Sequence, residues 1–369
     1  MIFFSNLVLA LVSNHPLVLL DSDMSATELS DIKSENINKR EALPQLNCTD
    51  MNEIIHKIQN STSEITFFTS GTTGQPKKVI HSVRTLTRMV RLGANYESDI
   101  WGFAYNPTHM AGLQVFFQAF ENKNTLVNVF NLDRSEIYNA ILKYGISHIS
   151  ATPTFYRLLF PFEQSCPSVL RVTFGGEKST QKLYDTITRI FPNARINNIY
   201  ASTEVGSLLV ANGDFFKIPT SIHDKIKIDD DELLIHKSLL GKSDSFSFCG
   251  DYYRSGDLIE WVDERRGLFR FKSRKNELVN IGGYKVNPDE VESAIMQMNG
   301  VQHALVYGKP NSVLGNILCA EIILEQGFVI KEFDIRQFLT EKLQDFKIPR
   351  IIKFVEKFSL TRTGKIKRS

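Results

Sequence analysis

At 369 residues, with 42% hydrophobic residues, 23% charged residues and a formal net charge of +2, the chain has the composition of a globular protein with a sizeable core. Such a length allows two domains, or one large domain and a small one. The near-neutral charge argues against a dedicated nucleic-acid-binding protein, which needs a basic excess to contact phosphates.

The four cysteines lie far apart in the sequence, at Cys48, Cys166, Cys249 and Cys319, and form no CxxC pair. Zinc-binding and redox motifs of paired cysteines therefore find no support. Reduced thiols in a cytoplasmic protein are the simplest explanation.

The first 20 residues are strongly apolar. A signal peptide is disfavoured because no Lys or Arg precedes Lys33. A membrane-spanning helix is disfavoured because polar residues and Pro16 interrupt the run. We therefore predict a buried helix to about Ser13, a buried strand over residues 17–20, and no membrane span.

Strand and helix patterns alternate between residues 64 and 190. Apolar spacing predicts strands over residues 64–69 and 169–174, and helices over 81–96 and 179–190. Because strands that alternate with helices build parallel sheets, an α/β fold with a mainly parallel sheet is expected.

The pattern changes near Arg274. A strand is predicted over residues 268–272, and Asn287, Pro288 and Glu290 form the N-cap, first position and third position of a helix start. Further strands are predicted over 301–307, 317–324 and 351–355, and a helix over 332–343. These elements indicate a compact α+β unit.

Residues 66–78 read TFFTSGTTGQPKK, a predicted strand that runs into a loop of hydroxyls, glycines and lysine. Gly71 and Gly74 allow backbone N–H groups to turn toward an anion, and Lys77 adds a positive charge. The hydroxyls that can donate to phosphate oxygens are those of Thr69, Ser70, Thr72 and Thr73. The GxxxxGK[ST] spacing of a Walker loop is absent. A solvated turn is the alternative interpretation.

This string resembles the phosphate-loop signature of the adenylate-forming superfamily, which contains acyl- and aryl-CoA ligases, nonribosomal-peptide adenylation domains and firefly-type luciferases. The family signature reads [ST]-S/T-G-[ST]-T-G-x-P-K-G, and Lys78 replaces the small residue after the lysine. Further motifs follow in family order, so that the resemblance extends from about Asn6 to Arg368.

Two motifs resemble the segments around the adenine and the phosphates. Residues 174–177 (FGGE) resemble a turn beside the adenine, formed by Gly175, Gly176 and Glu177. Residues 200–204 (YASTE) resemble Y-G-x-T-E, with Ala201 in place of the usual Gly and Ser202 at the variable position. The resemblance implies that Tyr200 stacks on the adenine, Thr203 touches the α-phosphate and Glu204 ligates Mg²⁺, a hard cation that prefers carboxylate oxygen. Glu204 as a helix cap is the alternative.

Two more motifs imply the ribose site and a hinge. Residues 253–257 (YRSGD) resemble Y-[RK]-[ST]-G-D, which makes Asp257 the acceptor for both ribose hydroxyls. Residues 273–276 stand where the family has G-R-x-[DK], with Ser273 replacing Gly and Asn276 replacing Asp or Lys. The resemblance implies that Arg274 contacts ribose or phosphate and that Asn276 is the hinge. Surface turns are the alternative in both places.

The resemblance also implies the domain organisation. A large N-terminal α/β domain with mainly parallel sheets and flanking helices is expected over residues 1–273, followed by a hinge at 274–276 and a small mobile α+β C-terminal domain over 277–369. The glycine-bearing loop with Gly283 would swing into the site for the thiol step. Lys365 near the C-terminus would drive adenylation by binding the carboxylate and an α-phosphate oxygen, although Ser359 stands where proline is usual.

Residues 107–112 (PTHMAG) resemble the P-x-x-H-x-x-G segment of CoA ligases, with one residue fewer before the histidine. The resemblance places His109 and Gly112 at the acyl pocket, whereas a loop histidine packed on the core is the alternative. It also favours free coenzyme A as the acceptor, with the phosphopantetheine arm of an acyl carrier protein as the second choice.

We therefore expect an AMP-forming acid–thiol ligase that uses ATP and Mg²⁺ to activate a small-molecule carboxylic acid and then forms a thioester. About 65 residues precede the phosphate loop, fewer than is usual in the family, so that part of the acyl pocket or of a dimer surface is in doubt while catalysis is expected to survive. A nucleotide-binding protein that has lost catalysis is the alternative from another class. The sequence identifies neither the acid nor the oligomeric state.

Overall fold

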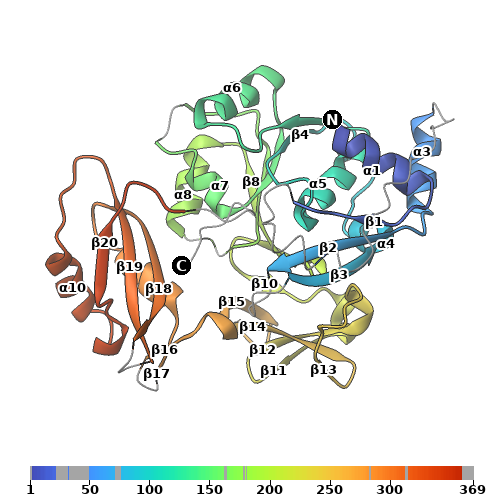
Figure 1. Cartoon of the computed structure of the whole chain (residues 1–369). Helices are drawn as coiled ribbons and strands as arrows, with labels where there is room; N and C mark the ends of the chain where they lie inside the picture. The colour runs from blue at the N-terminus through green and yellow to red at the C-terminus, as the bar shows by residue number, and fades with distance from the viewer. Residues whose placement is uncertain are drawn as a thin grey trace.

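The computed structural model describes residues 2–21, 32, 50–70, 76–161, 164–177, 179, 181–281, 284–311 and 315–359. In Figure 1 the segments from β16 to β20 form a lobe beside the remainder of the chain. The remainder contains two larger sheets, one mainly parallel and one antiparallel, and a small sheet near the N-terminus.

The N-terminal helix is confirmed, but the buried strand predicted over residues 17–20 is only partly right, because the strand ends at Val18 and that side chain is exposed. Helix α1 (Ile2–Val12) buries Leu7, Ala10 and Leu11, and strand β1 (Leu17–Val18) follows it. None of the helices in the described ranges is long and apolar enough to cross a membrane. After α3 (Met51–Gln59), β2 (Glu64–Ser70) pairs parallel with β1 and antiparallel with β3 (Pro76–Ser82).

The helix predicted over residues 81–96 is mostly wrong. Strand β3 continues to Ser82, whose side chain accepts a hydrogen bond from the Thr85 backbone N–H, so that helix α4 (Val83–Thr87) begins only at Val83. A short 3-10 turn, η1 (Ala94–Tyr96), follows Gly93. Lys77, predicted in a loop, lies in β3 opposite Thr69.

The mainly parallel sheet is confirmed, with the strand order β5-β4-β6-β7-β8-β9. Its parallel strands are β4 (Ile100–Phe103), β5 (Thr125–Asn128), β6 (His148–Ala151), β7 (Arg171–Gly175) and β8 (Arg195–Ser202). Strand β9 (Gly206–Asn212) pairs antiparallel with β8. The connecting helices are α5 (Met110–Glu121), α6 (Arg134–Tyr144), α7 (Pro153–Arg157) and α8 (Gln181–Ile190).

Helices cover both faces of this sheet. Helices α6 and α8 bury Ile141 and Ile187 against Ile149 and Val172 of the strands, whereas α5 packs on the other side around Phe103. The carboxyl ends of β7 and β8 lead directly into residues 175–177 and 202–204. Ligands of α/β proteins bind outside the carboxyl ends of parallel strands, so these segments are where a nucleotide site is expected.

The second large sheet is antiparallel and was not predicted, except for the strand near residues 268–272. Its order is β10-β15-β14-β12-β11, with β13 paired to β14. Its strands are β10 (Phe216–Lys217), β11 (Ile226–Asp229), β12 (Glu232–His236), β13 (Phe248–Cys249), β14 (Tyr252–Asp263) and β15 (Leu268–Arg274). The 3-10 turns between and after them are η2 (Thr220–Lys225), η3 (Lys237–Leu239) and η4 (Lys275–Glu277).

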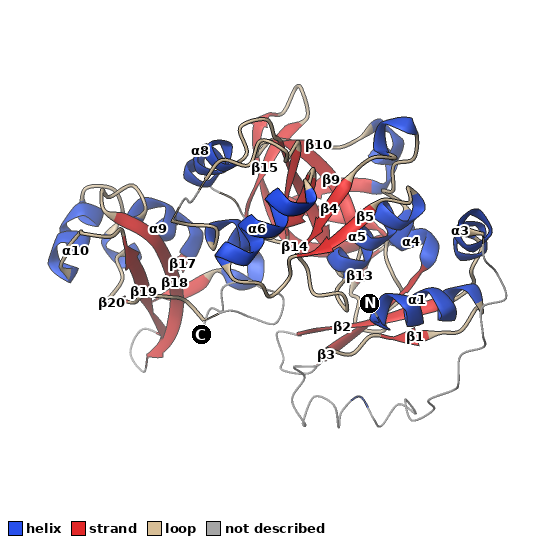
Figure 2. Ribbon diagram, turned by 90° about the horizontal axis from the view of Figure 1, so that it is seen from above, coloured by secondary structure: helices blue, strands red, loops and turns tan. Residues whose placement is uncertain are grey.

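The C-terminal lobe has the predicted α+β elements. Strands β16 (Val279–Ile281) and β17 (Tyr284–Val286) pair antiparallel. Strands β18 (Val301–Asn311) and β19 (Gly315–Leu324) also pair antiparallel, and β20 (Ile351–Phe354) pairs parallel with β19. Helices α9 (Pro288–Ile295) and α10 (Glu332–Thr340) lie together beside this sheet (Figure 2), and the turn η5 (Asp345–Lys347) precedes β20. As predicted, Asn287 caps α9 by accepting a hydrogen bond from the Asp289 N–H at 3.1 Å.

Candidate functional site

Three predicted site residues from three strands meet around the buried carboxylate of Asp257. Arg274 Nε donates to Asp257 Oδ1 at 2.6 Å, and Tyr200 Oη donates to Asp257 Oδ2 at 2.6 Å. Asp257 on β14 and Arg274 on β15 are direct cross-strand partners, while Tyr200 approaches from β8. The two sheets therefore meet at this carboxylate, which is 6% exposed.

The protonation states of this cluster follow from burial and charge. Burial, and then the charge of Asp257, raise the pKa of the Tyr200 hydroxyl well above its usual value, so that it remains a donor. Burial lowers the pKa of the Arg274 guanidinium, but the charge of Asp257, its hydrogen bond, and the neighbouring Tyr200 and Glu204 together outweigh burial and raise the pKa. The Tyr200 ring stacks on Phe271 with centroids 4.3 Å apart.

An irregular pairing between β12 and β14 positions Asp257. Leu234 pairs with Arg254 and Glu232 pairs with Leu258, so that Leu233 alone faces three residues of β14. Ser255 Oγ fills the interruption, since it donates to the Leu233 carbonyl at 2.6 Å and accepts from the Asp257 N–H at 3.0 Å. Such bulges commonly re-aim a side chain beside an active site.

The segment with Thr203 and Glu204 forms the turn between β8 and β9. His81 Nε2 donates to the Thr203 carbonyl at 2.7 Å, and the Gly241 N–H donates to the Glu204 carbonyl at 2.9 Å. Glu204 is half-buried, and its charge acts on both Arg274 and Tyr253. Burial, and then the Glu204 carboxylate, raise the pKa of Tyr253 to about 12. Glu204 thus belongs to the same electrostatic neighbourhood as the Asp257 cluster.

Two supporting side chains, His81 and Arg88, had not been singled out from the sequence. Arg88 Nη2 donates to the carbonyls of Val205 and Ser207, and His81 is 1% exposed. Burial, chiefly, lowers the pKa of His81 to about 4, so the ring is neutral and Nε2 carries the proton that it donates. A Cβ on Gly241 would lie 2.7 Å from the His81 ring. No local pattern indicates these contacts, which join segments over 100 residues apart.

The predicted adenine-side turn has a glycine requirement and a structural anchor. Gly176 has φ +81°, and a Cβ on Gly175 would lie 3.2 Å from Tyr105 Oη. Glu177 Oε2 accepts from the Thr154 hydroxyl at 2.7 Å and from the Thr154 N–H at 3.1 Å, at the start of α7. The Glu177 side chain therefore fixes this turn to α7.

The residues predicted at the acyl pocket have structural contacts. His109 Nε2 lies 3.0 Å from Asp21 Oδ2, to which Asn106 Nδ2 also donates at 2.9 Å. A Cβ on Gly112 would lie 2.4 Å from the Asn106 carbonyl oxygen, so helix α5 can pack here only with glycine. A role in binding an acyl group remains a prediction for both residues.

Part of the predicted site lies outside the described residues. This part includes Gly71 to Gly74, Gly283 and Lys365. The side chains of Thr69, Ser70 and Asn276 are also outside the description, although their backbones lie in β2 and η4.

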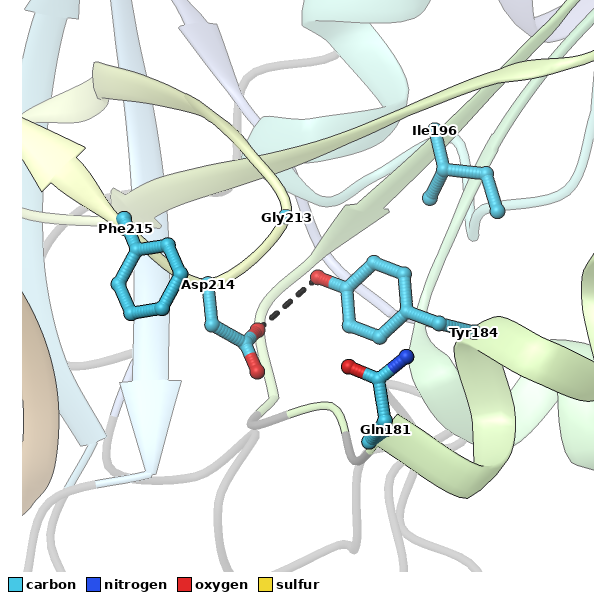
Figure 3. A pocket seen from close by; sticks show the side chains of 6 residues that line it. All are labelled: Gln181, Tyr184, Ile196, Gly213, Asp214 and Phe215. Carbon is cyan, nitrogen blue, oxygen red and sulfur yellow. Dashed lines mark hydrogen bonds between the residues drawn. The ribbon is translucent and has the colours of Figure 1, made fainter.

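A pocket of about 290 Å³ lies beside α8 and the β9–β10 turn (Figure 3). Its lining residues are Gln181, Tyr184, Ile196, Gly213, Asp214 and Phe215, none of which was predicted at the site. Tyr184 Oη donates to Asp214 Oδ1 at 2.9 Å, and Ser179 Oγ donates to the same oxygen at 3.1 Å. This buried network supports the chain just after the adenine-side turn.

The protein-family comparison matches residues 8–232 to the model described as AMP-binding enzyme and residues 290–365 to that described as AMP-binding enzyme C-terminal domain. The chain is 29% identical to 4-hydroxybutyrate–CoA ligase 1 of Metallosphaera sedula over 82% of the chain and 61% of the relative. It is 30% identical to the acetyl-coenzyme A synthetase of Bacillus subtilis over 82% of the chain and 59% of the relative. The chain thus spans about three fifths of the length of these relatives.

The solved structures support the fold. The o-succinylbenzoate CoA synthetase of Bacillus subtilis, in complex with its acyl-adenylate intermediate, gives a TM-score of 0.66 at 21% identity, covering 99% of this chain and 80% of that one. ATP-bound MatB from Rhodopseudomonas palustris gives 0.68 at 20% identity, covering 82% and 66%.

Proposed function

Because the chain belongs to the AMP-binding enzyme family, we propose that it activates a small-molecule carboxylic acid with ATP as an acyl-adenylate and then transfers the acyl group to coenzyme A. The observation that carries this proposal is the Asp257 cluster. A buried carboxylate held by Tyr200 and Arg274, next to the Thr203–Glu204 turn, has the donors and acceptors that a nucleotide needs.

The ribose would bind at Asp257. A carboxylate has about four lone-pair sites. Asp257 accepts one bond from Tyr200 and two from Arg274, of which the bond from Nη2 is long at 3.4 Å. One ribose hydroxyl would take the remaining site, and the second would replace the long Nη2 bond. The two short bonds fix the orientation of the carboxylate before the nucleotide arrives. The Tyr200 ring would receive the adenine, beside Gly175 and Gly176.

The half-buried Glu204 carboxylate fits a magnesium ion that is held mainly by phosphate oxygens, since Mg²⁺ usually takes only one or two carboxylates from the protein. When bound, the ion would neutralise phosphate charge and so allow one anion to attack another. Thr203 and the hydroxyls of residues 69–73 would hold the phosphates.

The two steps of the reaction would use the C-terminal lobe in turn. We propose that a domain of residues 277–369 moves relative to residues 1–273 about the hinge at 274–276, where Asn276 stands. Lys365 would reach the α-phosphate for adenylation, and the loop with Gly283 would enter for thioester formation. Removal of the Lys365 contact should therefore slow adenylation and leave thioester formation unchanged.

Coenzyme A is the proposed acceptor. The 4-hydroxybutyrate–CoA ligase and the acetyl-coenzyme A synthetase described above carry coenzyme A in their names. A carrier-protein arm is the second candidate. A cytoplasmic location is also proposed, and the free thiols of Cys166, Cys249 and Cys319 agree with a reducing compartment.

The test is carboxylate-dependent exchange of labelled pyrophosphate into ATP, over short, medium, long, aromatic and hydroxy acids, followed by thioester formation with coenzyme A. Exchange that depends on one acid class, with a coenzyme A product, is expected. Exchange without this product would favour a carrier protein. Binding of ATP with no exchange for any acid would favour the nucleotide-binding alternative and overturn the proposed activity.

A further inference from the structure

Glu232, at the start of β12, is a buried carboxylate that the reaction proposed above does not use. Its side chain is 2% exposed. Oε1 accepts from the Gly256 N–H at 2.9 Å, while Oε2 accepts from Arg254 Nη1 at 2.8 Å and from Lys275 Nζ at 2.9 Å. Both oxygens are therefore engaged, by groups from β14 and η4.

The ionised form of this carboxylate is the stable one. Burial raises the pKa of Glu232, but the hydrogen bonds from Lys275 and Arg254 outweigh burial and leave it below its usual value. Hydrogen bonds to charged groups are shorter and stronger than neutral ones. Glu232 thus holds its donors as a charged anchor inside the sheet.

The donors are the chain neighbours of the Asp257–Arg274 pair. Gly256 directly precedes Asp257, and Lys275 directly follows Arg274. Gly256 has φ +75° and lies in the bulge that faces Leu233, where its N–H has left the regular strand ladder. Glu232 supplies the acceptor that the ladder no longer provides, so it holds the backbone of Gly256 before Asp257 and the side chain of Lys275 after Arg274.

We propose that Glu232 is a positioning residue that aims Asp257 at the ribose hydroxyls of the nucleotide by holding the Gly256 bulge and the side chain of Lys275, which directly follows β15. This inference rests on the proposed function, because it takes Asp257 as the ribose acceptor. Glu232 itself touches no substrate. Its removal should therefore weaken ribose recognition specifically, and leave the adenine and phosphate contacts in place.

The experiment compares the affinities for ATP and for 2′,3′-dideoxy-ATP, which lacks both ribose hydroxyls, by isothermal titration calorimetry in excess MgCl₂ without an acid substrate. The wild-type protein is expected to bind ATP roughly ten- to hundredfold more tightly than the dideoxy nucleotide, as charge-assisted hydrogen bonds would give. Asp257→Asn defines the ratio that remains when the ribose acceptor is impaired.

Glu232→Gln is the decisive variant because it keeps the size of the side chain. An amide has one acceptor oxygen where the carboxylate has two, so either the Gly256 contact or the Arg254 and Lys275 contacts must be lost. We expect the ATP-to-dideoxy-ATP ratio to fall at least about threefold toward that of Asp257→Asn, with the dideoxy affinity unchanged. Glu232→Met removes both acceptors and should lower the ratio further.

Glu260→Gln is the matched control. Glu260 lies on β14, the strand of Asp257, in an exposed pair with Arg270, so its loss should leave the ratio at the wild-type value. A wild-type ratio in Glu232→Gln, or an equal loss of affinity for both nucleotides, would overturn the inference and assign Glu232 a purely structural role. A wild-type protein that does not distinguish the two nucleotides would instead refute the ribose role of Asp257, and with it the proposed site.

Discussion

The position of Thr203 depends on a buried imidazole from β3, 122 residues earlier in the chain. His81 donates from Nε2 to the Thr203 carbonyl, while its Nδ1 has no hydrogen-bond partner among the described residues. Only the neutral ring suits this environment, because a second proton on Nδ1 would be buried without an acceptor. The geometry of the proposed α-phosphate contact is therefore linked to one protonation state.

This linkage predicts how stability depends on pH. The pKa of His81 is about 4 in the folded chain and about 6.5 in the unfolded one, so the unfolded state binds more protons between these values. The stability that His81 contributes is complete above about pH 6.5 and falls as the pH decreases toward 4, by up to about 3 kcal/mol. Urea unfolding at pH 7, 6, 5 and 4.5 measures it.

His81→Gln should flatten this dependence, since glutamine can still donate to Thr203 but does not titrate. His223→Gln, at an exposed histidine, is the control and should leave the slope as in the wild type. If His81→Gln and the wild type lose stability in parallel as the pH falls, His81 is not the group responsible.

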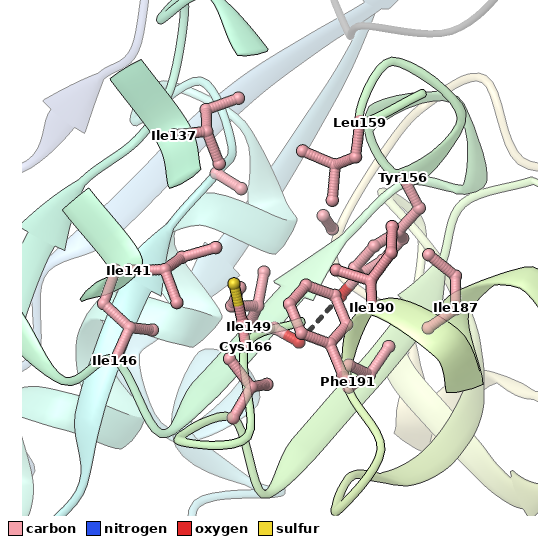
Figure 4. Packing of buried hydrophobic residues seen from close by; sticks show 14 of the residues in the cluster. Ile137, Ile141, Ile146, Ile149, Tyr156, Leu159, Cys166, Ile187, Ile190 and Phe191 are labelled. Atoms are coloured by element: carbon pink, nitrogen blue, oxygen red, sulfur yellow. Dashed lines mark hydrogen bonds between the residues drawn. The ribbon is translucent and has the colours of Figure 1, made fainter. Parts of the chain in front are cut away.

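At the scale of elements, the parallel sheet positions the candidate site, because the adjacent strands β7 and β8 end side by side and bring residues 175–177 close to residues 202–204. Helix α7 is tied to this sheet from its buried side, where Tyr156 packs among the residues drawn in Figure 4. Tyr156 Oη donates to the Ile149 carbonyl at 2.8 Å and approaches the Thr173 carbonyl at 3.2 Å. The same helix receives Glu177 at its first turn, so it joins the core to the adenine-side turn.

Tyr156→Phe tests this anchor. Removal of the hydroxyl leaves two buried carbonyls without that donor and should lower the free energy of unfolding by about 1–2 kcal/mol. Chemical denaturation measures the change. The control is Tyr144→Phe, at a tyrosine that is 48% exposed, for which a change within about 0.5 kcal/mol is expected. An equally small change in Tyr156→Phe would show that α7 is held by packing alone.

Helices and strands whose apolar residues follow a single spacing were predictable from the sequence. Segments in which helical and strand spacings overlap were not. Helix α9 carries its own cap, proline and acid, and α8 has a regular apolar face. In β3, Val79 and His81 alternate as in a strand, but the helical spacing of Val83 and Leu86 follows at once, so the two periods overlap. In the antiparallel sheet, β11 with β12 and β14 with β15 are hairpins of neighbouring segments, of which only the strand near residues 268–272 was predicted. The pairing of β10 with β15 joins distant segments, which local propensity does not encode.

At the scale of the whole molecule, the family motifs converge although they are scattered over the chain. Tyr200, Asp257 and Arg274 were predicted from motif order, and both Tyr200 and Arg274 hydrogen-bond to Asp257. Arg88 and Glu232 were not predicted, because they act through backbone groups and neighbouring charges whose proximity only the fold creates. Between the lobes, Lys275 contacts Glu232 and Asn287 Nδ2 donates to the Lys272 carbonyl at 3.3 Å.

The proposed use of the C-terminal lobe in two steps predicts that Lys365→Ala affects one half-reaction and not the other. Pyrophosphate exchange should fall by ~10²–10³-fold, because a charge that acts in the transition state is lost. Thioester formation from a preformed acyl-adenylate should continue at the wild-type rate, since that step would use the Gly283 loop. Single-turnover kinetics of each half-reaction separate the two effects.

Lys367→Ala, two residues further along, is the matched control and should leave both half-reactions as they are. Equal losses in both half-reactions of Lys365→Ala would contradict the proposed alternation. Unchanged pyrophosphate exchange would assign the adenylation step to another cation.

The interruption opposite Leu233 also constrains how the chain can change in length. Three residues of β14 lie opposite the single residue Leu233 of β12, so β14 has a surplus of two residues, which is an even number. Side chains of a strand alternate between its faces, and an even surplus preserves that phase. Deleting one residue at 255–256 would turn Ile259 and Trp261 from the interior toward solvent, whereas deleting both would leave them inside and sacrifice only the aim of Asp257.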